Sequence, residues 1–180
     1  MANASEIIAD WPEESGEAAK LVIDVYGEPH ETTPSLLIWY DVGPWRRLVA
    51  DKNFSHHNFP APHTDSVESF ICHLVPLDKF SPLAQFDGSV VANRTKCELS
   101  ARCHDEQANF LALNLANDII TGAKSVEEAR AYYAKEFLDY RRGKPTPYME
   151  RFRFDLAGME DPDIRLITEE DLASAMAGKG

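Results

Sequence analysis

The alternation of hydrophobic and polar residues predicts β-structure, mostly in the first half of the chain. Two apolar runs, Leu36–Tyr40 and Trp45–Ala50, flank the sequence Asp-Val-Gly-Pro. Gly43 and Pro44 favour a chain reversal there, so the pattern predicts a β-hairpin. Similar patterns predict a strand over residues 67–76, a second hairpin over residues 89–101 that turns near residues 93–96, and an edge strand over residues 152–156.

Helices are predicted where apolar residues recur every three or four positions. The longest covers residues 105–121 and ends before Gly122, because glycine suits a helix C-terminus. The next opens at Ser125, which can form a capping box with Glu128. Shorter helices are predicted from Ser15 to Gly27, over residues 78–86, and from Thr168 to Met176.

The order of these elements indicates the fold class. Successive hairpins predict an antiparallel sheet, and the helices cluster instead of alternating with single strands. We therefore expect an α+β fold, with an antiparallel sheet built from hairpins and two long helices packed on one face. Residues 15–156 are expected to form a single domain, between a loose acidic segment over residues 1–14 and an acidic segment with a short helix over residues 157–180.

The acidic residues are concentrated at the two ends of the chain. The 180 residues carry a net charge of −12. Residues 1–31 hold eight acids and one base, residues 155–180 hold seven acids and two bases, and residues 32–154 hold fifteen of each. Since binding to a phosphate backbone requires a basic face, the neutral body and acidic ends argue against a nucleic-acid partner.

Other features of composition indicate a cytoplasmic protein without a membrane partner. No apolar run approaches the roughly 20 residues that a membrane-spanning helix needs. The acidic N-terminus lacks the basic and apolar regions of a secretory signal. The three cysteines, Cys72, Cys97 and Cys103, cannot all pair within one chain, and an odd, sparse count suits reduced thiols.

The segment Ser-His-His-Asn-Phe-Pro-Ala-Pro-His-Thr-Asp, residues 55–65, holds the candidate catalytic and metal-binding residues. His63 and Asp65 are two positions apart, so on an extended strand they point the same way. They are the candidate catalytic residues, as an acid–base pair in which the carboxylate orients the imidazole. No nucleophile signature accompanies them, and the alternative is a rigid loop whose histidines make local hydrogen bonds.

A metal site is the second possibility for this segment. His57, His63 and Asp65 would supply two imidazoles and a carboxylate, a set used by catalytic zinc and by non-haem iron. However, Pro60 and Pro62 favour an extended path that would hold His57 and His63 roughly 20 Å apart. The sequence contains no HExxH motif and no paired CxxC motif, so a transition metal stays an open alternative and is not favoured. No P-loop or GxGxxG motif predicts a nucleotide or dinucleotide cofactor.

Four residues are candidates for ligand binding, three of them in or just before the longest predicted helix and the fourth in the first predicted hairpin. Asn109 falls on the apolar side of the helix, where its amide either ties the helix to the sheet or lines a polar pocket. Arg102 and Glu106 belong to a series of alternating charges that either form surface salt bridges or bind an anion. Trp45 has a large apolar surface, either for core packing or for contact with a ligand.

Three segments resemble a group of uncharacterised bacterial proteins of similar length. They are GPWRRLVADK, HNFPAPHTD and CELSARCHDEQANFLALNLANDIITG, and the resemblance covers roughly residues 20–135. It implies no activity.

Two functions follow from these observations. The first is a cytoplasmic binding or protein-interaction protein without catalytic activity, with a homodimer as one form of it. The second is a small-molecule or metal-dependent enzyme with its site around His57, His63 and Asp65. A pocket shared by His63, Asp65 and at least one further polar side chain would favour the second, the candidates being His57, His73, His104, Glu106 and Asn109.

Overall fold

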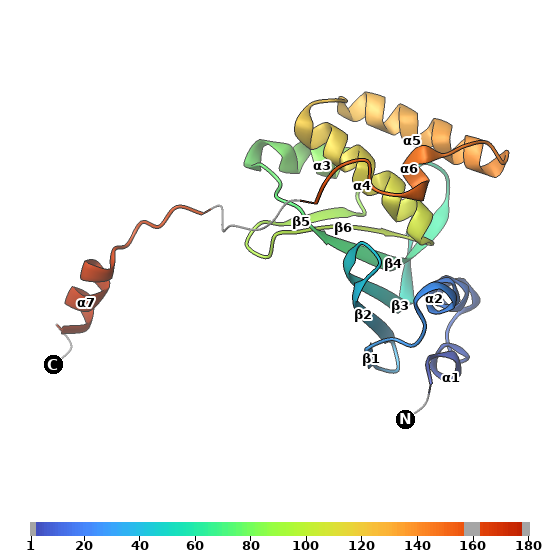
Figure 1. The fold of residues 1–180 in the computed structure, drawn as a ribbon, viewed down its shortest axis with the longest axis horizontal. Helices are drawn as coiled ribbons and strands as arrows, with labels where there is room; N and C mark the ends of the chain where they lie inside the picture. Colours follow the sequence, from blue (N-terminus) through green and yellow to red (C-terminus); the bar gives the residue numbers. More distant parts are fainter. Residues whose placement is uncertain (1–2, 157–162, 178–180) are drawn as a thin grey trace.

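The computed structural model describes residues 3–156 and 163–177, and its centre is a six-stranded antiparallel sheet (Figure 1). The strands lie in the order β1-β2-β3-β4-β6-β5. Their bounds are β1 Glu31–Thr32, β2 Leu36–Val42, β3 Trp45–His57, β4 His63–Cys72, β5 Val90–Asn93 and β6 Glu98–Cys103. The helices are α1 Ala4–Ile8, α2 Glu13–Tyr26, α3 Phe80–Phe86, which follows a short 3-10 turn at Leu77–Lys79, α4 Glu106–Thr121, α5 Val126–Arg141, α6 Pro147–Glu150 and α7 Glu169–Ala177.

The predicted hairpins are present. Strands β2 and β3 pair across the turn at Gly43, and β5 pairs with β6. Gly43 has a φ of 55°, in the left-handed region that favours glycine. A Cβ at this position would lie 2.6 Å from the hydroxyl oxygen of Tyr26. Both the backbone conformation and the packing against α2 therefore require glycine here.

One face of the sheet carries the hydrophobic core. Residues that pair across neighbouring strands share a face, and the paired positions that are buried define the covered face. They include Leu37, Trp39, Leu48, Ala50, Val67, Ile71, Leu99 and Ala101.

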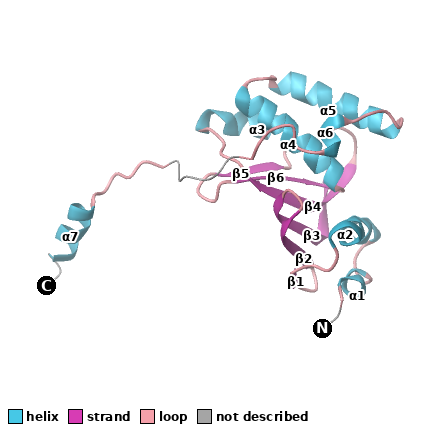
Figure 2. Cartoon of the chain, viewed as in Figure 1, coloured by secondary structure: helices cyan, strands magenta, loops and turns pink. Residues whose placement is uncertain are grey.

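Helices α2, α4 and α5 form two layers over the covered face (Figure 2). Helix α2 lies against β3 and β4, and α4 lies against β4, β5 and β6. Helix α5 packs on α3 and α4, on the outer side of α4 (Figure 1). The expected α+β fold is confirmed. The second long helix, α5, packs on α4 and not directly on the sheet.

The opposite face carries several charged residues among uncharged ones. Arg47 forms a two-pronged ion pair with Glu98, with N–O distances of 3.0 and 3.2 Å, and its guanidinium lies 3.9 Å from the centre of the Phe70 ring. Arg102 lies directly opposite Glu68 in the pairing of β4 with β6. Arg102 thus belongs to the opposite face and not to a pocket beneath the helices.

The two end segments differ from expectation. Residues 4–8 form α1, which is capped by Asn3 and buries Ala4, where a loose segment was expected. Residues 152–156 do not form the predicted edge strand. Instead Phe152 packs against Trp45 and Phe110, at ring-centre distances of 5.1 and 4.9 Å. Of the expected acidic segment over residues 157–180, the short helix is present as α7, and residues 157–162 and 178–180 lie outside the described residues.

None of the helices in the described ranges is both long enough and apolar enough to cross a membrane.

Candidate metal centre

The β3–β4 hairpin brings His57 and His63 together. His57 ends β3, His63 begins β4, and the two residues are partners in the antiparallel pairing. Their ring centres lie 5.0 Å apart. The expectation that Pro60 and Pro62 hold these histidines far apart is therefore wrong. The pairing of the two strands continues up to the histidines, and its backbone hydrogen bonds override the extended preference of the proline segment.

Phe59 anchors the loop between the two histidines. Its ring packs against Tyr133 of α5 at 5.0 Å and against Phe86 of α3 at 6.2 Å, and the Arg130 guanidinium lies 3.9 Å above it. The Phe59–Pro60 peptide bond is cis. The loop is thus fixed to the helical layer by a contact that joins residues far apart in the chain.

Asp65 completes the cluster. It lies two residues after His63 on β4 and points to the same face, as the spacing predicts, and it is 1% exposed. Asp65 Oδ1 lies 3.0 Å from His63 Nε2, and Asp65 Oδ2 lies 3.4 Å from His57 Nδ1. The three residues can each offer one ligand atom such that all these atoms lie within 4.8 Å of one another. Ligands of a tetrahedral zinc ion are roughly 3.3 Å apart, so the three side chains would have to draw closer together around a bound ion.

The hydrogen bonds of His63 decide what its second nitrogen can do. Nδ1 lies 2.8 Å from the carbonyl oxygen of Ala61, which can only accept, so Nδ1 carries a proton. Nε2 then faces the Asp65 carboxylate, and a bare lone pair there would repel the carboxylate. A cation, either a second proton or a metal ion, must lie between them. Without a metal, the Asp65 carboxylate, helped by the Cys103 thiol and opposed by burial, raises the pKa of His63 to about 11.

Asp65 keeps one oxygen free for such a cation. Ser89 donates a hydrogen bond to Asp65 Oδ2. Asp65 Oδ1 is buried and has no hydrogen-bond partner among the described residues, since its approach to His63 lacks hydrogen-bond geometry. A buried carboxylate oxygen without a donor is costly. Two atoms that share one ion need not align with each other, so a bound metal would account for this arrangement.

Asp87 supports the cluster from the side. Its Oδ1 accepts a hydrogen bond from the Ser89 N–H at 2.8 Å and lies 3.7 Å from His57 Nε2. Burial raises the pKa of the Asp87 carboxyl. A carboxylate beside the outer nitrogen of a histidine is the usual way to orient that histidine toward a metal. Asp87 is thus placed to orient His57.

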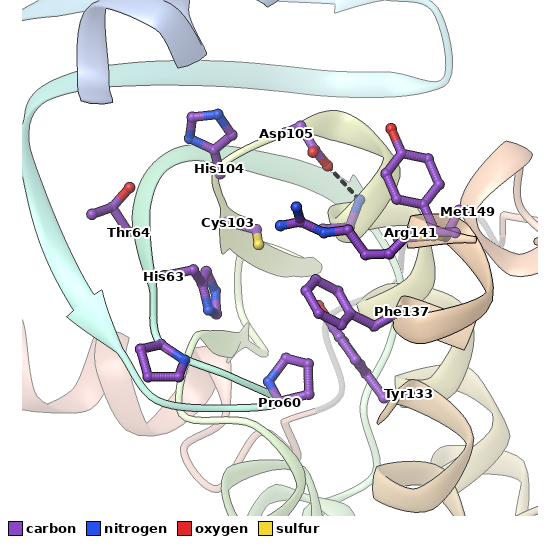
Figure 3. Close-up of a pocket in the computed structure, with 13 residues that line it drawn as sticks. Pro60, His63, Thr64, Cys103, His104, Asp105, Tyr133, Phe137, Arg141 and Met149 are labelled. Atoms are coloured by element: carbon purple, nitrogen blue, oxygen red, sulfur yellow. Dashed lines mark hydrogen bonds between the residues drawn. The ribbon is translucent and has the colours of Figure 1, made fainter. Parts of the chain in front are cut away.

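A cavity of about 290 Å³ opens beside His63 (Figure 3). Pro60, Tyr133 and Phe137 supply apolar walls, and Cys103 lies next to His63. Burial raises the pKa of the Cys103 thiol, and the neighbouring His63 lowers it. Because His63 lines the cavity and also belongs to the cluster, a small molecule in the cavity would lie next to the candidate metal centre.

Asn109 has a structural role outside the cluster. Its amide nitrogen donates to the Val67 carbonyl at 3.0 Å and to the Ser69 hydroxyl at 2.8 Å. These bonds tie α4 to the middle of β4. The structure therefore corresponds to the first of the two interpretations of Asn109, a connection between helix and sheet.

Glu106 and Trp45 also lie away from the cluster. The Glu106 carboxylate accepts hydrogen bonds from the Trp45 indole N–H and from the Tyr26 hydroxyl. Trp45 is 1% exposed and packs against Phe110. This group joins α4 to α2 and to the first hairpin, so these residues fasten the helices together.

Three residues at the site are missing from the sequence-based candidates. Asp87 and Ser89 lie beside Gly88 after α3, and they reach Asp65 only because β5 and β6 fold back along β4. Arg141 comes from the end of α5 and lines the cavity. The five bases Arg141, Arg142, Lys144, Arg151 and Arg153 are visible in the sequence as a basic cluster, but nothing there distinguishes the member that lines a cavity.

Fold and site together define an α+β protein in which two half-buried histidines and a buried carboxylate lie next to a small cavity. Comparisons with protein-family models, with curated proteins and with solved structures give no match.

Proposed function

We propose that this protein binds a divalent transition-metal ion, in the first place zinc, through His57, His63 and Asp65. We further propose that the metal acts on a small molecule in the neighbouring cavity. The observation that carries the proposal is the approach of His63 Nε2 to the buried Asp65 Oδ1 while Nδ1 is committed to a carbonyl. This contact needs a cation, and His57 supplies a third ligand beside it.

The ligand set favours a catalytic metal over a structural one. Structural zinc is held by four protein ligands, whereas catalytic zinc keeps three and leaves a position for water or substrate. Two histidines and a carboxylate also form the ligand set of non-haem iron enzymes. A metal with an open position lowers the pKa of a bound water or polarises a carbonyl group. The aromatic wall of the cavity would exclude bulk water from such a reaction.

A buried ion pair is the competing explanation. If a proton and not a metal lies between His63 and Asp65, the cluster only fastens the hairpin. Metal titration of the purified protein, first stripped with a chelator, separates the two. We expect one equivalent of Zn²⁺ to bind, and Co²⁺ to give the visible absorption of a low-symmetry site.

Matched histidine variants sharpen the experiment. His57→Gln and His63→Gln are expected to abolish stoichiometric binding. His56→Gln is the control, because His56 is adjacent, exposed and outside the cluster. Circular dichroism reports whether each variant is folded. The proposal fails if the parent protein binds no equivalent of Zn²⁺, Co²⁺ or Fe²⁺, or if His56→Gln weakens binding as much as His57→Gln does.

A non-catalytic interaction function is the second candidate, supported by the C-terminal segment. Ile164 and Leu166 are 86% and 90% exposed, and Met176 on α7 is 76% exposed. Exposed apolar side chains on one short segment are a feature of surfaces that bind another chain. Light scattering of the full chain and of a chain ending at residue 156 tests this: a loss of dimer on truncation supports it, and a monomer in both cases counts against it.

A further inference from the structure

Arg141 is a cation of the cavity wall for which the described residues supply no acidic partner. Arg141 is the last residue of α5, and its guanidinium lies 5.2 Å from the centre of the Phe137 ring. Figure 3 shows the side chain of Arg141 reaching across the cavity toward Cys103 and His63. Within the described ranges, no ion pair or hydrogen bond of the Arg141 side chain is found. Its charge is therefore available to a ligand.

One acid, Asp105, lines the same cavity, and its carboxylate already accepts a backbone hydrogen bond. Asp105 caps α4, and its Oδ1 accepts a hydrogen bond from the Ala108 N–H at 2.8 Å. Of the described residues that line the cavity, only Arg141 carries a fixed positive charge. A guanidinium that is oriented by an aromatic ring and faces a cavity is suited to a planar anion, because its N–H groups match two oxygens at once.

Size and polarity restrict the rest of the ligand. A volume of about 290 Å³ is at the small end for a ligand pocket. Much of the remaining lining is apolar, with Pro60 and Pro62 from the loop and Phe137 from α5. Asp105 lines the cavity and Asp65 lies 3.0 Å from the lining residue His63, so a doubly charged group such as phosphate would be repelled more strongly than a single carboxylate.

We propose that the cavity binds a small carboxylic acid with an apolar or aromatic body, its carboxylate paired with Arg141 and its other end at His63. This inference rests on the proposed function, because it names the class of substrate that would meet the metal. The carboxylate would fix the orientation of the molecule, and the apolar walls would hold its body.

Binding of model acids tests the inference directly. Benzoate and phenylacetate are titrated into the zinc-loaded full chain and followed by protein NMR, with benzamide and phenylacetamide as uncharged counterparts and inorganic phosphate as a further probe. We expect at least one acid to bind saturably, at least roughly tenfold more tightly than its amide, because a charge-assisted hydrogen bond is lost in the amide. Phosphate is expected to bind more weakly than that acid.

Neighbouring arginines provide the matched variants. Arg141→Met is expected to weaken binding of the acid roughly tenfold or more, and Arg142→Met, the next residue, to leave it unchanged. The inference is overturned if neither acid binds saturably, or if an acid and its amide bind equally well. It is also overturned if phosphate binds more tightly than the acid, or if Arg141→Met and Arg142→Met lose the same affinity for the acid.

The two proposals can fail separately. His57→Gln removes a metal ligand but leaves Arg141 in place. If the parent binds zinc but no carboxylic acid, the inference about the cavity is overturned and the metal site stands. If an acid binds through Arg141 in a parent that takes up no metal, the cavity is a carboxylate site, and both the metal-dependent function and the encounter with a metal at His63 are overturned.

Discussion

His63 Nε2 lies 3.0 Å from Asp65 Oδ1, and the other nitrogen of His63 is bonded to a backbone carbonyl. His63 and Asp65 are the first and third residues of β4, so the two-residue period of the strand places them on the same face. The third member, His57, reaches them across the hairpin. The site is thus a local pair completed by a strand partner, and this arrangement leads to several expected results.

Zinc should stabilise the protein against heat. A ligand that binds only the folded state at a hundred times its Kd adds about 2.7 kcal/mol to the free energy of unfolding. For a chain of this length, that corresponds to a rise in Tm of roughly 5–10 °C. Differential scanning calorimetry with and without Zn²⁺ measures it. An excess of chelator should reverse the shift, and His57→Gln should not show it; a similar shift in His57→Gln would contradict the assignment.

Phe59→Ala should weaken the metal site without touching a ligand. Loss of the ring contacts with Tyr133 and Phe86 is expected to lower the free energy of unfolding by about 2 kcal/mol, since the ring is only partly buried. Because Phe59 anchors the loop between the histidines, the Kd for zinc should rise as well. Urea unfolding and metal titration measure the two effects. Phe54→Ala, on β3 outside the loop, is the control and should leave the Kd for zinc unchanged.

Asn109→Ala should be destabilising but should not change the metal stoichiometry. The substitution leaves the Ser69 hydroxyl without its donor inside the core and creates a small cavity, so the expected loss is about 2 kcal/mol in the free energy of unfolding. Asn117→Ala, on a more exposed position of the same helix, should cost less than about 0.5 kcal/mol. Urea denaturation compares the two. A loss of zinc binding in folded Asn109→Ala would assign this residue to the site instead.

His73 should make part of the stability depend on pH. Burial lowers the pKa of His73 below its ordinary value of 6.5, and its ring lies 5.0 Å from Phe154. The unfolded chain therefore takes up a proton at a higher pH than the folded chain does. The contribution of His73 to stability is complete above pH 6.5 and is lost as the pH falls through the folded pKa.

Urea unfolding of metal-free protein between pH 7.5 and pH 5 provides the measurement. His73→Gln should show a shallower decline of stability toward low pH than the parent does. The exposed His56→Gln should follow the parent curve. An identical pH dependence of His73→Gln and the parent would show that His73 does not carry the effect.

Local patterns were sufficient for most of the secondary structure. The turn at Gly43, the capping box of Ser125 with Glu128 and the stop at Gly122 depend on a few neighbouring residues, and each is present. The shared face of His63 and Asp65 follows from the two-residue period of a strand. In the same way, the buried position of Asn109 follows from the helical period. Each of these features depends only on residues close together in the chain, so the sequence is sufficient to predict it.

Only the tertiary structure decided the composition of the site. His57 lies beside His63 only if the proline-containing loop between them reverses the chain direction. The contact of Phe59 with Tyr133, more than seventy residues away in the sequence, helps to hold the loop in that conformation. Asp87 and Ser89 come to the cluster through the order of strands, and Arg141 through the packing of α5 on α4. Backbone preferences of a short loop are small compared with strand pairing and the burial of an aromatic ring, so the sequence near residue 60 could not by itself determine the path of the chain.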